Sequence, residues 1–197
     1  MDGEERSLTL ERRSGERAVL TLRRCTPEEL PAILALQEEV ARALPKPELF
    51  VVTTAEELRE SLTRDWCLAA WDGERLAAFT LMVVNRVTPR SAGTYLDYDD
   101  ARLQRCVTYD TTFVRREYRG LGLQRALGRL KDEAALAMGA EEALSTVSPE
   151  NSHSLENALA RGFEICGDRS LYSGVRRYIL RKKLNGKGGR DGSRDVS

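Results

Sequence analysis

Residue types that build metal centres and disulfide frameworks are scarce in this sequence. Histidine occurs once, as His153, and the four cysteines lie far apart with no Cys-x-x-Cys spacing. A single histidine argues against a His-based metal site or triad, so no metal is expected, and His153 itself is predicted to be solvated. Each cysteine lies within or beside an apolar run, which predicts buried, reduced thiols and a cytoplasmic location. These cysteines are Cys25, Cys67, Cys106 and Cys166.

An excess of charge and long apolar runs are also lacking. Lys+Arg and Asp+Glu both count 31, so the formal net charge is zero, whereas a general nucleic-acid binder would show a basic excess. No apolar run approaches the ~18 residues of a transmembrane helix. Residues 1–6 have no apolar signal-peptide core. We therefore expect neither nucleic acid nor a membrane as a partner.

The chain of 197 residues, with 41% apolar and 31% charged residues, is long enough for one globular domain with a full core. Residues 1–17 are polar, and residues 185–197 are polar and rich in glycine. We expect a polar N-terminal segment over 1–17, the folded domain over 18–184 and a disordered tail over 185–197.

Strand-like and helix-like patterns alternate through the domain. Thr26 and Thr54 each begin a capping box, with Glu29 and Glu57 three residues later, and so predict two helix starts. The run 76–84 is apolar on both faces, which is typical of a central strand. The predicted order is β-α-α-β-β-β-α-β-α-β-β, with strands at 18–24, 67–71, 76–84, 107–114, 142–147, 163–167 and 171–184 and later helices at 123–138 and 149–161.

Two glycines stand between a strand and a helix at residues 119–124, Arg-Gly-Leu-Gly-Leu-Gln. Glycine lets the backbone turn sharply and come close to a ligand. The free N–H groups at the start of the following helix suit a phosphate. This pattern favours a phosphorylated cofactor, although a tight turn without a ligand explains a lone Gly-x-Gly about as well. Basic side chains gather at the same place: Arg115, Arg116, Arg119 and Arg125.

This segment resembles motif A of the GNAT acyl-CoA N-acyltransferases. In that motif a strand and a short loop precede Gln/Arg-x-x-Gly-x-Gly/Ala and a helix. Arg119 and Gly122 match the first and fourth positions, while Gln124 stands where glycine or alanine is usual.

A second segment, about thirty residues further on, resembles motif B of the same family. Asn151, Ser154 and the pair Gly162-Phe163 have the expected spacing, and Ala158 occupies the position usually held by tyrosine. Two motifs in order are more specific than either alone. The resemblance covers residues 18–184. The segment 172–180, Tyr-Ser-Gly-Val-Arg-Arg-Tyr-Ile-Leu, also resembles the closing segment of a bacterial branch of the family without assigned substrates.

The resemblance implies one GNAT-like α/β (α+β) domain, whose central mixed, mostly antiparallel, twisted sheet is flanked by helices. It also implies acetyl-CoA as co-substrate. Backbone groups of Phe113 and Val114 would hold the pantetheine, and Asn151 would contact the same arm, although Asn151 also reads as a plain helix N-cap. The pyrophosphate would lie against the amides of Arg119, Gly120, Leu121, Gly122, Leu123 and Gln124.

Asp110, on the motif strand, is a candidate general base. A carboxylate on a central strand is costly unless it is paired or functional, so Asp110 reads equally as a base and as a structural residue held by an arginine or a backbone N–H. Strict alternation places Thr108, Asp110 and Thr112 on one face of this strand, and Tyr109, Thr111 and Phe113 on the other.

Tyr172 is a candidate general acid. In many family members the motif B tyrosine protonates the departing thiolate, which Ala158 cannot do. A thiolate with a basicity near that of cysteine, about pKa 8.5, leaves readily, so a dedicated acid is not required. Tyr172 is a possible substitute from the final strand pair, but the pattern favours a strand aromatic with a solvated hydroxyl.

Two further segments bear on the acceptor. Either Arg176 or Arg177 would meet an anionic substrate group, or both belong to one exposed charged face of an edge strand. The acidic, tyrosine-bearing loop 95–100 would attract a cationic amine or simply be solvated.

These features together predict an acetyl-CoA-dependent N-acetyltransferase that acts on the primary amine of a small molecule by direct transfer. No cysteine or serine stands in an activated setting that would form a covalent intermediate. The alternatives are transfer to a protein or peptide, and a non-catalytic acyl-CoA-binding module. The sequence leaves the oligomeric state open between a monomer and a homodimer.

Overall fold

The computed structural model describes residues 5–11, 14–15, 17–46, 49–172 and 174–184, and its described strands form one sheet. The strand order is β1-β2-β3-β4-β5-β6-β8-β7, and every neighbouring pair is antiparallel except β5 and β6. The strands are β1 (Arg6–Glu11), β2 (Arg17–Arg24), β3 (Trp66–Asp72), β4 (Arg75–Val83), β5 (Cys106–Val114), β6 (Glu142–Val147), β7 (Glu164–Leu171) and β8 (Val175–Lys183).

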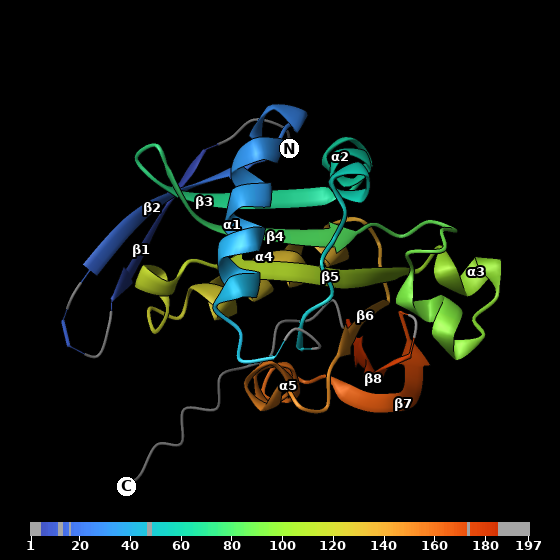
Figure 1. Ribbon diagram of the computed structural model, residues 1–197. Coiled ribbons are helices and arrows are strands. Elements are labelled where there is room, and N and C mark those ends of the chain that lie inside the picture. The colour runs from blue at the N-terminus through green and yellow to red at the C-terminus, as the bar shows by residue number, and fades with distance from the viewer. Residues whose placement is uncertain (1–4, 12–13, 16, 47–48, 173, 185–197) are drawn as a thin grey trace, which may run out of the picture.

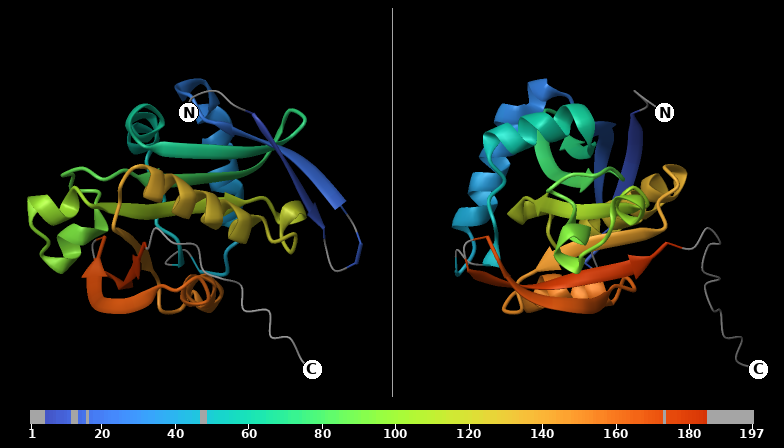
Figure 2. Two further views of the ribbon diagram at one scale, coloured as in Figure 1. Left: turned by 180° about the vertical axis from the view of Figure 1, so that it is seen from behind. Right: turned by 90° about the vertical axis from the view of Figure 1, so that its right-hand side faces the viewer.

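Helices cover both faces of this sheet (Figures 1 and 2). On one face lie α1 (Leu30–Arg42) and α2 (Ala55–Arg64), and α4 (Leu123–Ala137) lies on the other. The helix α5 (Ser152–Leu159) follows β6, and the short α3 (Asp100–Leu103) lies in the loop before β5. This layering leaves the central strands in contact with protein on both sides.

Both predicted capping boxes are present. The Thr54 hydroxyl accepts from the Glu57 amide at 3.2 Å, and the Glu57 carboxylate accepts from the Thr54 amide at 2.8 Å. The Thr26 box precedes a 3₁₀ turn at Pro27–Glu29, and α1 follows it directly. Each box satisfies N–H groups that a helix start would otherwise leave without a partner.

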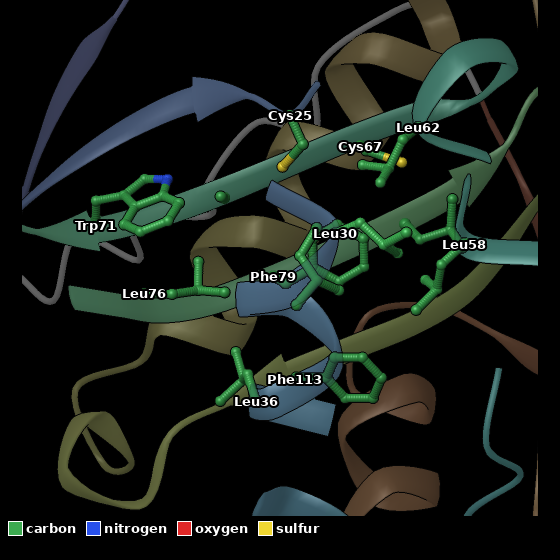
Figure 3. Close-up of a cluster of buried hydrophobic side chains, with 13 residues drawn as sticks. Cys25, Leu30, Leu36, Leu58, Leu62, Cys67, Trp71, Leu76, Phe79 and Phe113 are labelled. Atoms are coloured by element: carbon green, nitrogen blue, oxygen red, sulfur yellow. The ribbon is translucent and has the colours of Figure 1, made fainter. Parts of the chain in front are cut away.

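The core divides into clusters above and below the sheet. Figure 3 shows the cluster under α1 and α2, where Leu36, Phe79 and Phe113 meet. On the opposite face, Leu123 and Leu127 of α4 pack against strand residues. The strand β4 is buried along its whole length after Arg75, as its continuous apolar run predicts.

The predicted fold class is confirmed: one α/β domain with a mixed, mostly antiparallel sheet flanked by helices. One boundary differs, because Arg6–Glu11 pairs along its length with β2, and Leu8 and Leu10 pack against the α4-side cluster. The sheet therefore begins before residue 18. The tail predicted at 185–197 lies outside the described residues. None of the described helices is long and apolar enough to cross a membrane.

Candidate functional site

The sheet opens between its two parallel strands. In the described chain β5 and β6 pair through three residue pairs, the last of which is Thr108 with Leu144. Beyond this point the Ser145 hydroxyl donates to the Tyr109 carbonyl at 2.8 Å, while β5 continues to Val114 along β4 instead. One backbone edge of β5 therefore faces a gap at the centre of the sheet, where a ligand can form the hydrogen bonds that a neighbouring strand would otherwise make.

A β-bulge lies at the start of this opening. Leu81 pairs with Thr111 and Met82 with Tyr109, so Asp110 is the extra residue of β5. The extra residue reverses the alternation that follows. Phe113 packs under α1, whereas Tyr109 packs with Phe163 on the α4 side. The prediction that Tyr109 and Phe113 share one face was therefore wrong, because strict period-2 counting does not allow for an inserted residue.

The opening leads into a cavity of about 600 Å³. Its walls come from the segment before α2, the loop before β5, strands β5, β6 and β8, and helices α4 and α5. Of the predicted site residues, Asp110, Tyr172, Gln124 and Asn151 line it together. Residues that are far apart in the sequence thus meet around one cavity, whose size suits a small ligand.

Asp110 is held by Arg90, which sequence analysis did not identify. The Arg90 Nη2 donates to Asp110 Oδ2 at 2.6 Å, while 29% of the Asp110 side chain stays accessible. Arg90 also contacts the Ser61 hydroxyl and lies 3.6 Å from the fully buried carboxylate of Asp65. Burial raises the pKa of Asp110 above its ordinary value, and the positive charge of Arg90 acts in the opposite direction.

Tyr172 adopts a left-handed backbone conformation, with a φ of 49°. Such a conformation costs a bulky residue about 1 kcal/mol or more. It places the Tyr172 ring 6.5 Å from the Tyr95 ring, edge to face, and its hydroxyl 3.4 Å from the Thr146 hydroxyl. Both tyrosines line the cavity. The pKa of Tyr95 is raised to about 12, chiefly by burial and further by Tyr172 and Asp110.

Lys131 is the other residue that sequence analysis missed. It is 3% exposed and lines the cavity, and its ammonium donates to the Thr111 carbonyl at 3.1 Å. Burial lowers its pKa to about 7. In α4 the buried positions include 123, 127, 131 and 135, whereas Met138, at the end of the predicted helix 123–138, is 38% exposed. The sequence signal that could have identified Lys131 is its place in an i, i+4 series of otherwise apolar residues.

The glycine turn has the conformation that its sequence predicts. Gly120 and Gly122 have φ values of 81° and 75°, and a Cβ at either position would meet no atom within 4 Å. Gly122 is the N-cap of α4, and no described side chain caps this helix start. Leu121 and Leu123 are buried in the core, so only their backbone amides could reach a ligand. The first amides of α4 are therefore open to an anion.

The basic cluster at this turn is smaller than predicted. Arg115 points away from it, donating to the Leu76 carbonyl and to Glu39 of α1. Arg119 folds back to the Val114 carbonyl at 3.3 Å. Arg125 lines the cavity. Contacts between distant segments decide where each arginine points, so spacing alone could not separate them.

The remaining predicted contacts are placed as follows. Asn151 caps α5 by accepting from the Ser154 amide at 3.1 Å, and its Nδ2 lies 3.5 Å from the Leu49 carbonyl. The N-cap role of Asn151 is thus confirmed. Ala158, on the same helix, lines the cavity. The Phe113 side chain is in the core, so its part in a ligand site rests on its backbone.

The sequence matches no family model and no curated protein. Solved structures are similar throughout the domain. The GNAT-family acetyltransferase of Streptococcus pneumoniae is 18% identical, with a TM-score of 0.64, 84% of this chain covered and 99% of that chain. The ribosomal-protein-S18-alanine N-acetyltransferase of Escherichia coli is 16% identical, with a TM-score of 0.63, and the match covers 86% of this chain and 96% of that chain. The PaiA N-acetyltransferase of Thermoplasma acidophilum, solved with coenzyme A, is 14% identical, with a TM-score of 0.60, and the match covers 83% of this chain and 98% of that chain. This chain therefore has the GNAT fold.

The lowered pKa of Lys131 predicts a pH-dependent stability. The unfolded lysine titrates near 10.4, so between pH 7 and 10 the unfolded chain binds more protons than the folded chain. Relative to a Lys131→Met variant, the parent should gain unfolding free energy as the pH rises through this window, by up to ~1.4 kcal/mol per pH unit. Urea denaturation of both proteins at several pH values measures the difference. A difference that is flat with pH would contradict the buried-lysine assignment.

Proposed function

We propose that this protein is an acetyl-CoA-dependent N-acetyltransferase that transfers acetyl directly to the primary amine of a small molecule. The observation that carries the proposal is the cavity at the β5–β6 opening, which is lined by a carboxylate, a tyrosine and the first turn of α4. The GNAT fold supports it, because enzymes of this fold place acyl-CoA chemistry at the same opening.

Acetyl-CoA fits the residues of this site. The amides at 119–124 lie at an uncapped helix start, and the two glycines leave open space above the backbone. A pyrophosphate there would accept hydrogen bonds from the free N–H groups and lie at the positive end of the helix dipole. Gln124 and Arg125 face the cavity beside this turn. The glutamine at the usual Gly/Ala position thus contributes a polar group to the cavity wall.

The pantetheine arm would lie along the open edge of β5. Backbone groups along β5 alternate between the two edges, and the Arg115 amide donates to the Ala77 carbonyl of β4. In this register Phe113 pairs with Phe79 of β4, and the backbone groups of Val114 face the opening toward β6. Asn151 would contact the same arm through its amide nitrogen while its carbonyl oxygen caps α5. A single asparagine can fill both roles because its amide carries separate donor and acceptor groups.

Acetyl-CoA supplies an acyl carbon activated as a thioester, and Asp110 would take the proton that the acceptor amine loses. Its position on the cavity wall gives it access to the amine directly or through water. Arg90 fixes the carboxylate, and the raised pKa makes Asp110 a stronger base than an ordinary aspartate. Arg90 thus holds the candidate base in place.

Tyr172 would donate a proton to the departing thiolate. It lines the same cavity as Ala158, the position at which relatives carry tyrosine, its backbone is strained, and it is 44% exposed. Strain of this kind persists where the surrounding structure requires the side chain to point one way. The hydroxyl is thus supplied from the β7–β8 turn instead of from α5.

The acetyl-CoA site should be lost in a Gly122→Glu variant, because the new side chain puts bulk and negative charge at the helix start. Gly139→Glu is the matched control, since Gly139 has the same φ of 75° and equally open space at the far end of α4. Calorimetry should show acetyl-CoA binding to the parent and to Gly139→Glu, and at least ~10²-fold weaker binding to folded Gly122→Glu. Equal affinity in both variants would contradict the pyrophosphate assignment.

An Asp110→Asn variant should lower kcat by roughly 10²-fold or more, because the amide keeps the size of the side chain but cannot accept the proton. The parent rate should fall as the pH drops below the raised pKa of Asp110, and the variant should lose this acid limb. CoA release with a thiol reagent, across an amine panel, measures both. Asp168→Asn, at an exposed ion pair on β7, is the control. An unchanged rate at every pH would leave Asp110 structural.

A Tyr172→Phe variant removes one hydroxyl and should reduce turnover by roughly 10²-fold if that hydroxyl donates the proton. Acetyl-CoA affinity should stay close to that of the parent, because the pyrophosphate contacts are untouched. Tyr178→Phe, on β8 outside the cavity, is the comparison for losing a tyrosine hydroxyl in this region. Full activity in Tyr172→Phe would show that the thiolate leaves without this acid.

A further inference from the structure

Two neighbouring arginines on β8 have opposite environments. Arg176 keeps 63% of its side chain exposed and forms an ion pair with Asp168 of β7 at 2.7 Å. Arg177 is 4% exposed and lines the cavity. Because side chains alternate along a strand, one arginine serves the outer surface and the other faces the site. The structure thus separates two residues that sequence analysis could not distinguish.

Arg177 brings a buried positive charge to the cavity wall. Its Nη1 lies 3.5 Å from the Leu49 carbonyl, and its guanidinium carbon lies 6.0 Å from the centre of the Tyr172 ring. Burial lowers the pKa of Arg177, so the surroundings disfavour its charged form. Because Arg177 lines the cavity, an anion that enters can meet its guanidinium, and a carboxylate matches the planar fork of donors.

Asp110, the candidate base, lines the same cavity as Arg177, and so do Tyr95 and Tyr172. Tyr95 meets Tyr172 edge to face, and the Arg177 guanidinium lies 6.0 Å from the centre of the Tyr172 ring. A carboxylate and a guanidinium thus border one cavity, with two aromatic rings linking them. An acceptor that carries an amine and an anion would find a complementary group for each.

The rest of the wall mixes polar side chains, such as Thr53 and Thr146, with an apolar part. The apolar part is contributed by the segment before α2 and by the strands beside the opening, and it leaves room for a side chain without charge. These wall residues are Phe50, Val51, Val52, Val147 and Leu180.

We propose that the acceptor is an amino acid with an apolar side chain, and that Arg177 binds its carboxylate while the amine faces Asp110. This inference rests on the proposed acetyltransferase function and specifies its substrate class. Bidentate pairing to Arg177 sets the position of the amine, so Arg177 determines specificity and takes no part in proton transfer. An internal residue of a protein has no such carboxylate and would lack this contact.

The test compares acids with their amides. L-leucine, L-methionine and L-phenylalanine are offered with acetyl-CoA beside the matching amino-acid amides, which keep the amine and the side chain. The parent should favour the acid in kcat/KM by about 10- to 10²-fold, the scale of a charge-assisted pair. Arg177→Met should abolish this preference while keeping the amide reaction, and Arg177→Lys should restore part of it. Arg176→Met should behave as the parent.

A second measurement does not depend on turnover. Calorimetry on the CoA-loaded protein compares N-acetyl-L-leucine with N-acetyl-L-leucinamide, and circular dichroism with acetyl-CoA affinity verifies that each variant is folded. Tighter binding of the acid, lost in Arg177→Met, supports the inference. Equal binding and equal rates for acid and amide in a parent that binds acetyl-CoA would overturn it and leave the acetyltransferase proposal standing. A parent that binds no acetyl-CoA would instead overturn the proposed function.

Discussion

The extra residue in β5 is the constraint on which the site depends. Asp110 has no counterpart in β4, so the strand bends at the point where its pairing with β6 ends. Directly after the bulge, the Thr111 carbonyl accepts from Lys131 of α4 and from the Thr80 hydroxyl of β4. It also leaves the Asp110 carboxylate facing Arg90. One insertion thus sets the opening of the sheet, the position of the candidate base and the burial of a lysine.

The site concentrates charges that a purely structural core would avoid. Asp65 is fully buried beneath Arg86 and Arg90, Lys131 is almost fully buried, and Arg177 is buried on the far wall. Buried charges cost stability unless they are paired, and breaking such a pair by removing one partner costs still more. A network of this kind holds side chains in one arrangement, which is what a catalytic carboxylate requires. Stability and preorganisation therefore act in opposite directions at this site.

Ala158 stands at the motif B position where relatives carry tyrosine, so the tyrosines of this cavity come from other segments. Alanine on α5 leaves space, and the tyrosine pair Tyr95 and Tyr172 borders the cavity from two loops distant in the chain. The proposed acid then belongs to the same turn region as Arg177, on the acceptor side of the opening. The chemistry of leaving-group protonation and the recognition of the acceptor would thus be coupled through one hairpin.

The sequence by itself determined the features that depend on local order. The two capping boxes, the doubly buried β4, the glycine turn and the helix that follows it were all predicted, because turns, caps and periodicity are properties of neighbouring residues. Tertiary structure alone decided the faces of β5 after the bulge, the partner of Asp110, the burial of Lys131 and the choice between Arg176 and Arg177. An inserted residue resets the period of a strand, and a long side chain turns toward whichever distant segment offers it a charge or a carbonyl. Both depend on contacts between parts of the chain that are far apart in sequence.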